Sequence, residues 1–206
     1  MVVASCNGRP HSIGFSEEMV KLFGCAPGTL FFVSVAKSSV WCRKQGTSLL
    51  NAEYVNFITI LVEELVAAGC APRGILVLSL YDEERHALSS LLHGEKGLKD
   101  VEVESVDAAQ GSESPFVVLS TTRPRGSIGF VQNRPRQCVA LSRAQSGLVV
   151  VGDEFMGKWS GEGYSSWDNL IQNHLAVGRL IRRDGHRDMM RLLGIPNQDW
   201  VEVTRN

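Results

Sequence analysis

The stretch FVVLSTTRPRGSIGFVQNRPRQCVALSRAQSGLVVVGD, residues 116–153, decides the fold. Its two ends, 116–122 and 148–153, are apolar and rich in β-branched residues, which is typical of buried strands. Between them, Pro135 stands where the first turn of a helix tolerates proline, and Gly147 stands beyond the expected end of that helix. Strand, helix and strand in this order predict neighbouring parallel strands joined by a crossover helix.

The same alternation continues on both sides of this stretch. Further apolar strands are expected at 31–36, 74–80 and 101–106, and further helices at 51–69, 82–94 and 167–177. Strands that alternate with helices predict an α/β fold with a mainly parallel central sheet. The loops that follow the strands then lie on one edge of the sheet, where such folds bind ligands.

Length and composition are those of one soluble domain. The chain has 206 residues, a net charge of −1, 44% hydrophobic and 21% charged residues, so it is not a polycation and disorder is not expected. It contains no apolar run of about 20 residues and no secretory signal, which predicts an intracellular protein, cytoplasmic or nuclear, without a membrane partner. Five scattered cysteines without a C-x-x-C pair, and five histidines without metal spacing, argue against a disulfide framework and a metal site.

Residues 114–152 contain no Asp, Glu or Lys but five arginines: Arg123, Arg125, Arg134, Arg136 and Arg143. Guanidinium groups suit phosphate oxygens. Arg136 and Arg143 are seven residues apart on the expected helix, so both are expected on one face, where they can point at one anion. The alternative is a solvated arginine loop with surface ion pairs.

Two loops follow expected strands. The segment SVDAAQGSE, residues 105–113, places polar groups at a strand's carboxyl end, where they either meet a ligand or simply form a capped turn. The segment Gly152–Lys158 is a near miss for a phosphate loop. Trp159 replaces the hydroxyl that would bind magnesium, and Asp153 and Glu154 would repel phosphate, so we do not expect it to bind a nucleotide.

Several motifs occur together in a fixed order. They are GTSLLNAE (46–53), ILVLSLYDEER (75–85), VESVDAAQGSESPFVVLSTTR (103–123), GSIGF (126–130) and PRQCVALSRAQSGLVVVGD (135–153). In this order they resemble the second RecA-like domain of superfamily 1 helicases of the up-frameshift (nonsense-mediated decay) type. The resemblance covers roughly residues 5–178. It implies a RecA-like three-layer domain over 1–178, followed by a basic C-terminal helix and tail over 179–206.

In that family two RecA-like domains enclose ATP, and the resemblance implies roles for individual residues. Arg143 and Arg9 match arginines that contact the γ-phosphate, and Glu113 matches a glutamate near the ribose. Gln110 and Gly111 belong to the same loop, and Arg136 is expected at the nucleotide. The residues expected at a single nucleic-acid strand are Ser79, Tyr81, Asp107, Thr121, Thr122 and Arg123.

The chain departs from the family pattern in ways that matter. Gly8 stands where the family has an adenine-stacking tyrosine, Pro10 and Ser12 alter the same segment, and Glu84 replaces a glutamine. Around the arginine finger, Cys138 and Gln145 replace an asparagine and an arginine.

The family's first RecA-like domain, with its phosphate loop and magnesium-binding box, is not expected within these 206 residues. The resemblance therefore implies ATP and Mg²⁺ only when such a domain completes the site, in cis or in trans, with single-stranded RNA or DNA as the other partner. As it stands the chain is expected to show little or no ATPase activity. The alternatives are a non-catalytic nucleic-acid-binding module, a self-sufficient enzyme that uses Gly152–Lys158, and a partner-docking domain.

Overall fold

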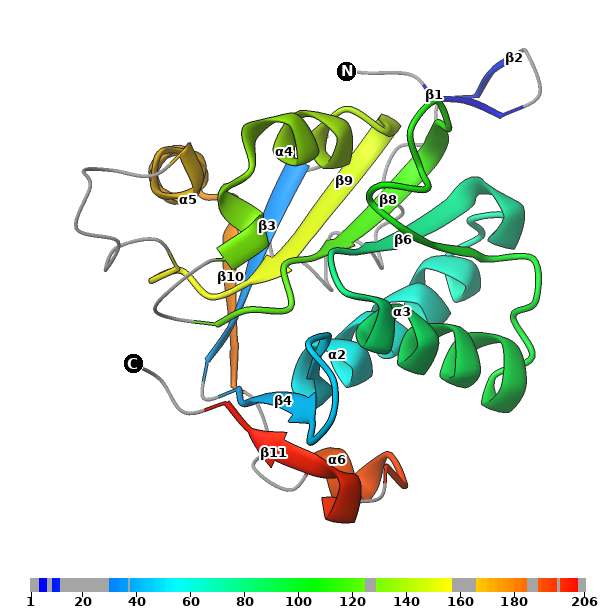
Figure 1. The fold of residues 1–206 in the computed structure, drawn as a ribbon. Helices are drawn as coiled ribbons and strands as arrows, with labels where there is room; N and C mark the ends of the chain where they lie inside the picture. Colours follow the sequence, from blue (N-terminus) through cyan, green and yellow to red (C-terminus); the bar gives the residue numbers. More distant parts are fainter. Residues whose placement is uncertain are drawn as a thin grey trace.

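The computed structural model describes residues 4–6, 9–11, 30–36, 38–124, 129–156, 166–184, 189–195 and 197–203. Its centre is a six-stranded sheet in the order β10-β3-β9-β8-β6-β7, and every neighbouring pair in it is parallel (Figure 1). The strands are β3 (Leu30–Ala36), β6 (Ile75–Ser79), β7 (Glu102–Ser105), β8 (Ser114–Ser120), β9 (Ala144–Gly152) and β10 (Leu180–Asp184). The five strands predicted from the sequence, and the parallel α/β arrangement, are confirmed.

Helices cover both faces of this sheet, which gives three layers (Figure 1). One face packs against α2 (Ala52–Ala67), α3 (Asp82–Ser89) with its π-helical continuation η2 (Ser90–Glu95), and α6 (Met189–Leu192). The other face packs against α4 (Arg134–Leu141), α5 (Ser166–Ala176) and the segment that follows β7. This is the RecA-like arrangement.

Smaller elements complete the described chain. A three-stranded antiparallel sheet joins β11 (Trp200–Glu202), β4 (Val40–Arg43) and β5 (Leu49–Asn51). A hairpin joins β1 (Ala4–Cys6) and β2 (Arg9–His11), and it lies beside β8 (Figure 1). Short turns of 3₁₀-helix are η1 (Pro72–Gly74), η3 (Gly129–Gln132) and η4 (Asn197–Asp199). Within the described ranges, no helix has the length and apolar character needed to cross a bilayer.

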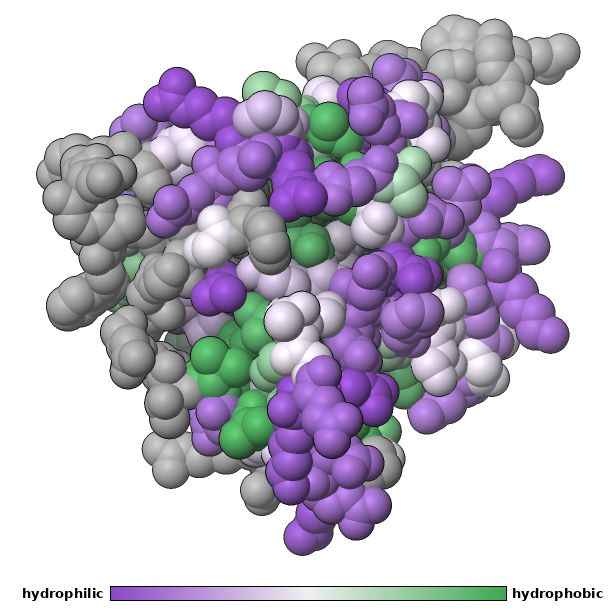
Figure 2. Space-filling view, viewed as in Figure 1, coloured by the Kyte–Doolittle hydropathy of each residue, from purple (hydrophilic) through white to green (hydrophobic). Residues whose placement is uncertain are grey.

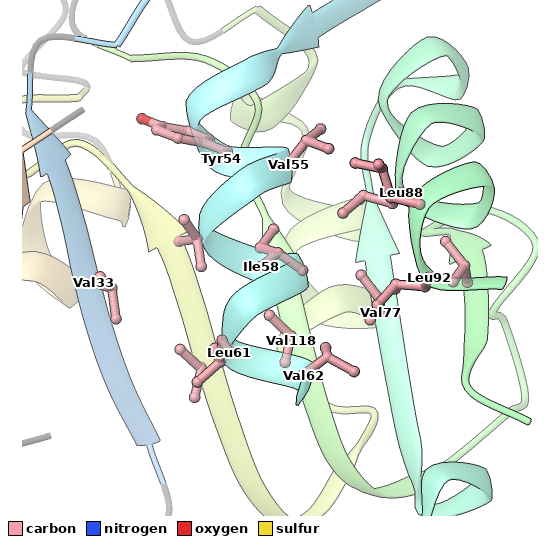
Figure 3. Packing of buried hydrophobic residues seen from close by; sticks show 14 of the residues in the cluster. Val33, Tyr54, Val55, Ile58, Leu61, Val62, Val77, Leu88, Leu92 and Val118 are labelled. Carbon is pink, nitrogen blue, oxygen red and sulfur yellow. The ribbon is translucent and has the colours of Figure 1, made fainter. Parts of the chain in front are cut away.

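The longest helix, α2, starts and packs as its sequence pattern predicts. The side chain of Asn51 caps it by accepting a hydrogen bond from the amide of Tyr54, and Gly69, with φ +96°, follows its end. Figure 3 shows Ile58 and Val62 facing the sheet, with Val77 and Val118 among their neighbours in the core cluster. Burial of this face holds the helix on the sheet.

The helix α4 is shorter than the sequence predicts. It ends at Leu141, and the strand β9 already begins at Ala144, so Arg143 lies between the two elements. Gly147 therefore does not follow a helix but lies inside β9. A Cβ atom at this position would lie 2.8 Å from the ring of Phe116, so close packing between strands, and not helix termination, requires the glycine.

The basic segment near the C-terminus also differs from its prediction. Residues 180–184, expected within a basic helix and tail, form β10 at the edge of the sheet, beyond the expected domain limit at residue 178. Short helical turns and β11 then follow. These five residues form a strand because they pair with β3. Their sequence alone does not predict this strand.

The two faces of α2 give a direct test of the core. Ile58 is fully buried and Ile60, on the same helix, is 47% exposed. We expect Ile58→Ala to lower the free energy of unfolding by about 2–5 kcal/mol, because the substitution leaves a cavity. Ile60→Ala should change it by only about 0.5 kcal/mol. Chemical denaturation measures both, and equal effects would contradict the packing described here.

Candidate functional site

The ends of β6 and β8 bring together most of the residues expected at a nucleic-acid strand. The two strands are neighbours, with Ser79 opposite Ser120, so the segments that leave them run side by side. Tyr81 follows β6, and the residues Thr121, Thr122 and Arg123 follow β8. The carboxyl edge of the sheet therefore brings these residues together.

Several of these side chains are buried. Ser79, Thr121 and Thr122 are 0% exposed and Tyr81 is 5% exposed, whereas Arg123 is half-buried. The hydroxyl of Ser79 donates a hydrogen bond to Glu84 Oε2 at 2.9 Å and accepts one from the amide of Tyr81 at 3.2 Å. In this structure the serine and the threonines support the surface from behind.

The centre of this support is Glu84, in the first turn of α3, and sequence reasoning noted it only as a replaced glutamine. Its carboxylate is fully buried and accepts hydrogen bonds from the hydroxyls of Ser79 and Thr122 and from the amide of Asn51. Burial raises the pKa of Glu84 to about 7, and these hydrogen bonds oppose the shift. Glu84 lies three residues after the buried Tyr81. This spacing does not by itself predict a buried carboxyl group, which only the tertiary packing reveals.

Thr122 has an unusual backbone conformation. Its φ is +58°, which is rare for a β-branched residue. Its amide donates to Ser120 Oγ at 3.2 Å, and its carbonyl accepts from Asn51 Nδ2 at 3.0 Å. The residue after it, Arg123, donates from Nε to the hydroxyl of Tyr81 at 2.7 Å, and its guanidinium lies 5.7 Å from the centre of the tyrosine ring. The turn after β8 thus ends with an arginine stacked on a tyrosine.

The segment between β7 and β8 crosses the sheet. It leaves at Ser105, on the carboxyl edge, and reaches Ser114, where β8 pairs with the start of β9. Val106 and Ala109 bury their side chains against the sheet, while Asp107 and Gln110 are exposed. Gly111 has φ +92°, which favours glycine at this turn. The segment therefore presents its polar residues on the outer surface from one edge to the other.

Asp107 and Arg136 form a two-pronged ion pair between this segment and α4. Arg136 Nε lies 2.9 Å from Asp107 Oδ1, and its second nitrogen lies 2.8 Å from Oδ2. The carboxylate raises the pKa of the guanidinium. Asn133 caps the helix by accepting from the amide of Arg136. In this structure Arg136 is matched by a carboxylate of the chain itself.

Arg143 has neutral partners instead. Its guanidinium donates to the carbonyls of Val139 at 3.0 Å and Ser112 at 3.1 Å, and to the hydroxyl of Ser142 at 2.7 Å. It is partly exposed. Because α4 ends before it, Arg143 does not share a helix face with Arg136, so the expectation of one common helix face is wrong.

Other expected nucleotide residues lie near Arg143. Glu113 accepts a hydrogen bond from Gln145 Nε2 at 3.3 Å, at the start of β8 and β9. Arg9 belongs to β2, and its hairpin is drawn near the start of β8 (Figure 1). The side chain of Arg9, like Arg125, Gly8 and Ser12, lies outside the described residues. Figure 2 shows a largely hydrophilic surface over α4, in keeping with its arginines.

The described part of the near-miss phosphate loop has a structural role. Gly152 ends β9, and a Cβ atom there would lie 2.9 Å from Phe32 and from Thr121. Asp153 accepts from the amide of Phe155, and Glu154 forms a two-pronged ion pair with Arg182 at 2.7 Å. Gly157 and Lys158 lie outside the described residues. Among the residues that the structure describes, no group of three His, Cys, Asp or Glu can hold a metal ion.

The pKa of Glu84 predicts a pH dependence. The folded chain keeps this proton up to about pH 7, whereas the unfolded chain loses it near 4.5, so the free energy of unfolding falls as pH rises between these values. Glu53, 3% exposed, behaves alike because burial raises its pKa to about 7. We expect Glu84→Gln to stabilise the fold by about 1–3 kcal/mol at pH 8 and by little at pH 5.

Denaturation at several pH values checks this expectation. Glu84→Gln should remove about half of the pH dependence between 4.5 and 7, and Glu53→Gln should remove most of the rest. Glu64→Gln, on the exposed side of α2, is the matched control and should leave the wild-type slope. A Glu84→Gln variant with the wild-type slope would show that this carboxyl is not buried.

Comparison with known proteins agrees with the geometry. Residues 14–155 match the AAA domain family (AAA_12). Regulator of nonsense transcripts 1 of Caenorhabditis elegans is 35% identical over 115 residues, which are 52% of this chain and 11% of that protein. The putative regulator of nonsense transcripts 1 of Takifugu rubripes is 32% identical over 153 residues, which are 70% of this chain and 13% of that protein.

A relative of a different name shows the same kind of match. The 5'-3' DNA helicase ZGRF1 of Mus musculus is 34% identical over 128 residues, which are 60% of this chain and 7% of that protein. The chain thus spans 7% to 13% of the length of these three relatives. With more than half of its residues matched, the chain belongs to the AAA domain family, and it is a superfamily 1 helicase-type domain of the up-frameshift kind.

Proposed function

We propose that this chain is the C-terminal half of an ATP-dependent RNA or DNA helicase core. The observation that carries the proposal is the state of Arg143: a partly exposed guanidinium held by two carbonyls and a hydroxyl. These acceptors orient it without neutralising its charge. Such an arginine can stabilise the negative charge that develops on a γ-phosphate during hydrolysis.

The nucleotide itself is bound by a first RecA-like domain, supplied in cis or in trans. The described residues offer an arginine for phosphate at Arg143, which supports its part in this proposal. Glu113 and Gln110 lie on the segment that leads to Arg143, where they face the ribose side of the nucleotide. Gly111 provides the turn in that segment, and Arg9 is the second arginine for the γ-phosphate.

Arg136 has a structural role in place of the nucleotide contact expected from the sequence. Its ion pair with Asp107 clamps α4 to the segment after β7. Nucleotide contacts made by Arg143 therefore connect, through α4 and Asp107, with the carboxyl edge of the sheet. ATP binding closes the two domains on a strand and hydrolysis reopens them.

The strand lies on the carboxyl edge, where Arg123 is the most exposed of the expected residues at the ends of β6 and β8. Ser79, Thr121 and Thr122 hold this arginine and Tyr81 in place from behind. Arginine contacts phosphate and its guanidinium plane can stack on bases. The ring of Tyr81 is buried, so Tyr81 serves here to hold Arg123 through its hydroxyl. The relatives include proteins named for nonsense transcripts and for DNA helicase activity, so we include both RNA and DNA as strands.

The first test uses the isolated chain of 206 residues. We expect no ATP turnover with or without single-stranded RNA or DNA, because the phosphate loop and the magnesium site belong to another domain. We expect weak strand binding that falls steeply with salt, since phosphate contacts release counterions. Strand-stimulated ATP turnover by this chain alone would contradict the two-domain proposal. Strand binding in the isolated chain and no effect of this domain on turnover in a full-length protein would favour a non-catalytic binding module.

The second test substitutes Arg143 in a protein that contains both RecA-like domains. Arg143→Ala should lower ATP turnover by about 10³-fold or more, because the developing phosphate charge loses its partner. Strand affinity should change by less than about threefold. Arg73→Ala, in η1 at the amino-terminal end of β6, is the control and should keep turnover. Unchanged turnover in Arg143→Ala would show that another residue is the arginine finger.

A further inference from the structure

We propose that Glu84 is a positioning residue for Tyr81 and Arg123, and that it acts through Ser79 and Thr122. One carboxylate oxygen, Oε2, accepts the hydroxyls of both Ser79 and Thr122, at 2.9 Å and 2.5 Å. These two residues control the backbones that lead to Tyr81 and Arg123. A single buried group thus sets both members of the pair before any strand binds.

The first arm of this arrangement runs through Ser79. Its oxygen accepts a hydrogen bond from the amide of Tyr81, and its single hydrogen is shared between Glu84 Oε2 at 2.9 Å and the carbonyl of Tyr81 at 3.1 Å. The backbone of Tyr81 is therefore tied to the end of β6, and the ring is 95% buried against its surroundings. The carboxylate fixes the direction of the serine hydroxyl, and the serine fixes the tyrosine.

The second arm runs through Thr122. A β-branched residue at φ +58° is strained, and it persists only where its neighbours hold it. Three buried side chains from different elements do so: Ser120 binds its amide, Asn51 its carbonyl and Glu84 its hydroxyl. The left-handed turn sends the chain from β8 toward Tyr81, where Arg123 donates its Nε hydrogen to the tyrosine hydroxyl.

Burial of the Glu84 carboxyl group carries a cost in desolvation, which its hydrogen bonds offset in part. Glu84 is completely buried, and its hydrogen-bond partners are three hydroxyls, those of Ser79, Ser120 and Thr122, and the amide of Asn51, with no cation among the described residues. Burial raises the pKa of Tyr54, and the charges of Asp153, Glu84 and Glu53 add to this shift. An apolar residue at this site would leave the amide of Asn51 and the hydroxyls of Ser79 and Thr122 without this acceptor, so the carboxyl group keeps buried donors paired.

The consequence for strand binding rests on the proposed function, whereas the positioning itself does not. The experiment therefore measures the pair without a strand. The Nε–H of Arg123 gives an NMR signal that Arg123→Lys identifies, and its exchange with solvent reports its bond to Tyr81. We expect slow exchange in the wild-type chain and in Glu84→Gln, because the amide still bonds both hydroxyls.

Loss of the carboxylate should free the arginine. In Glu84→Ala we expect exchange of the Arg123 Nε–H to become about tenfold faster, as for the loss of a hydrogen bond, while the backbone amides of β6 and β8 keep their protection. Glu83→Ala is the control: the neighbouring carboxylate pairs with Arg43 and should leave the signal unchanged. Unchanged exchange in Glu84→Ala would overturn the proposal.

Thr122→Val provides a second measurement where Glu84→Ala fails to fold. Valine keeps the shape and the backbone strain of threonine but removes the hydroxyl that reaches Glu84, so exchange should again become about tenfold faster. If it stays slow, Glu84 does not act through Thr122 and the proposal is wrong. Adding Glu84→Ala to Thr122→Val should cause less than additive change, because both break the same contact.

A strand-binding assay then distinguishes the positioning of Arg123 by Glu84 from the contact of Arg123 with the strand. With single-stranded RNA and with single-stranded DNA, we expect Glu84→Ala to weaken binding about tenfold or more and Glu84→Gln to bind like wild type. If Arg123 is freed in the NMR measurement but affinity does not change, the positioning stands and the proposed strand contact of Arg123 is wrong. If Glu84→Ala and Glu84→Gln weaken binding equally while Arg123 stays fixed, the positioning falls.

Discussion

The constraint on which this structure depends is the burial of a parallel sheet on both faces. Strands β6, β8 and β9 are almost continuously apolar, because helices cover each side. Parallel pairing then forces each connection to cross from one edge of the sheet to the other. The segment from Ser105 to Ser114 makes this crossing without a helix, and it carries exposed polar residues across the whole face.

That constraint concentrates polar groups where the strands end. Backbone and side chains at the carboxyl edge leave the sheet while still buried, so they need partners. Glu84, Asn51, Ser79 and Thr122 satisfy one another there. Burial of the Glu84 carboxyl group costs free energy in its charged form, which raises its pKa to about 7. What this arrangement provides is a fixed geometry for the tyrosine and arginine in front of it.

The arginines show how electrostatics separates residues that look alike in sequence. Arg136 and Arg143 both occur in the same short motif, yet Asp107 matches one of them and neutral acceptors hold the other. Asp107 is 29 residues from Arg136 in the chain, and the sheet brings them together. An arginine that keeps its charge uncompensated is suited to a passing phosphate, and an arginine in an ion pair is suited to holding two elements together.

The sequence alone determined the five central strands, the helices α2, α3 and α5, and the family, because hydrophobic period and ordered motifs are local properties of the chain. Tertiary structure alone decided three things. Residues 180–184 became a strand because β3 offered an open edge, and α4 stopped at Leu141 because β9 pairs with β8 from Ala144 onward. Glu84 became the centre of the site because burial, which no local pattern encodes, turned a surface-type residue into a buried acceptor.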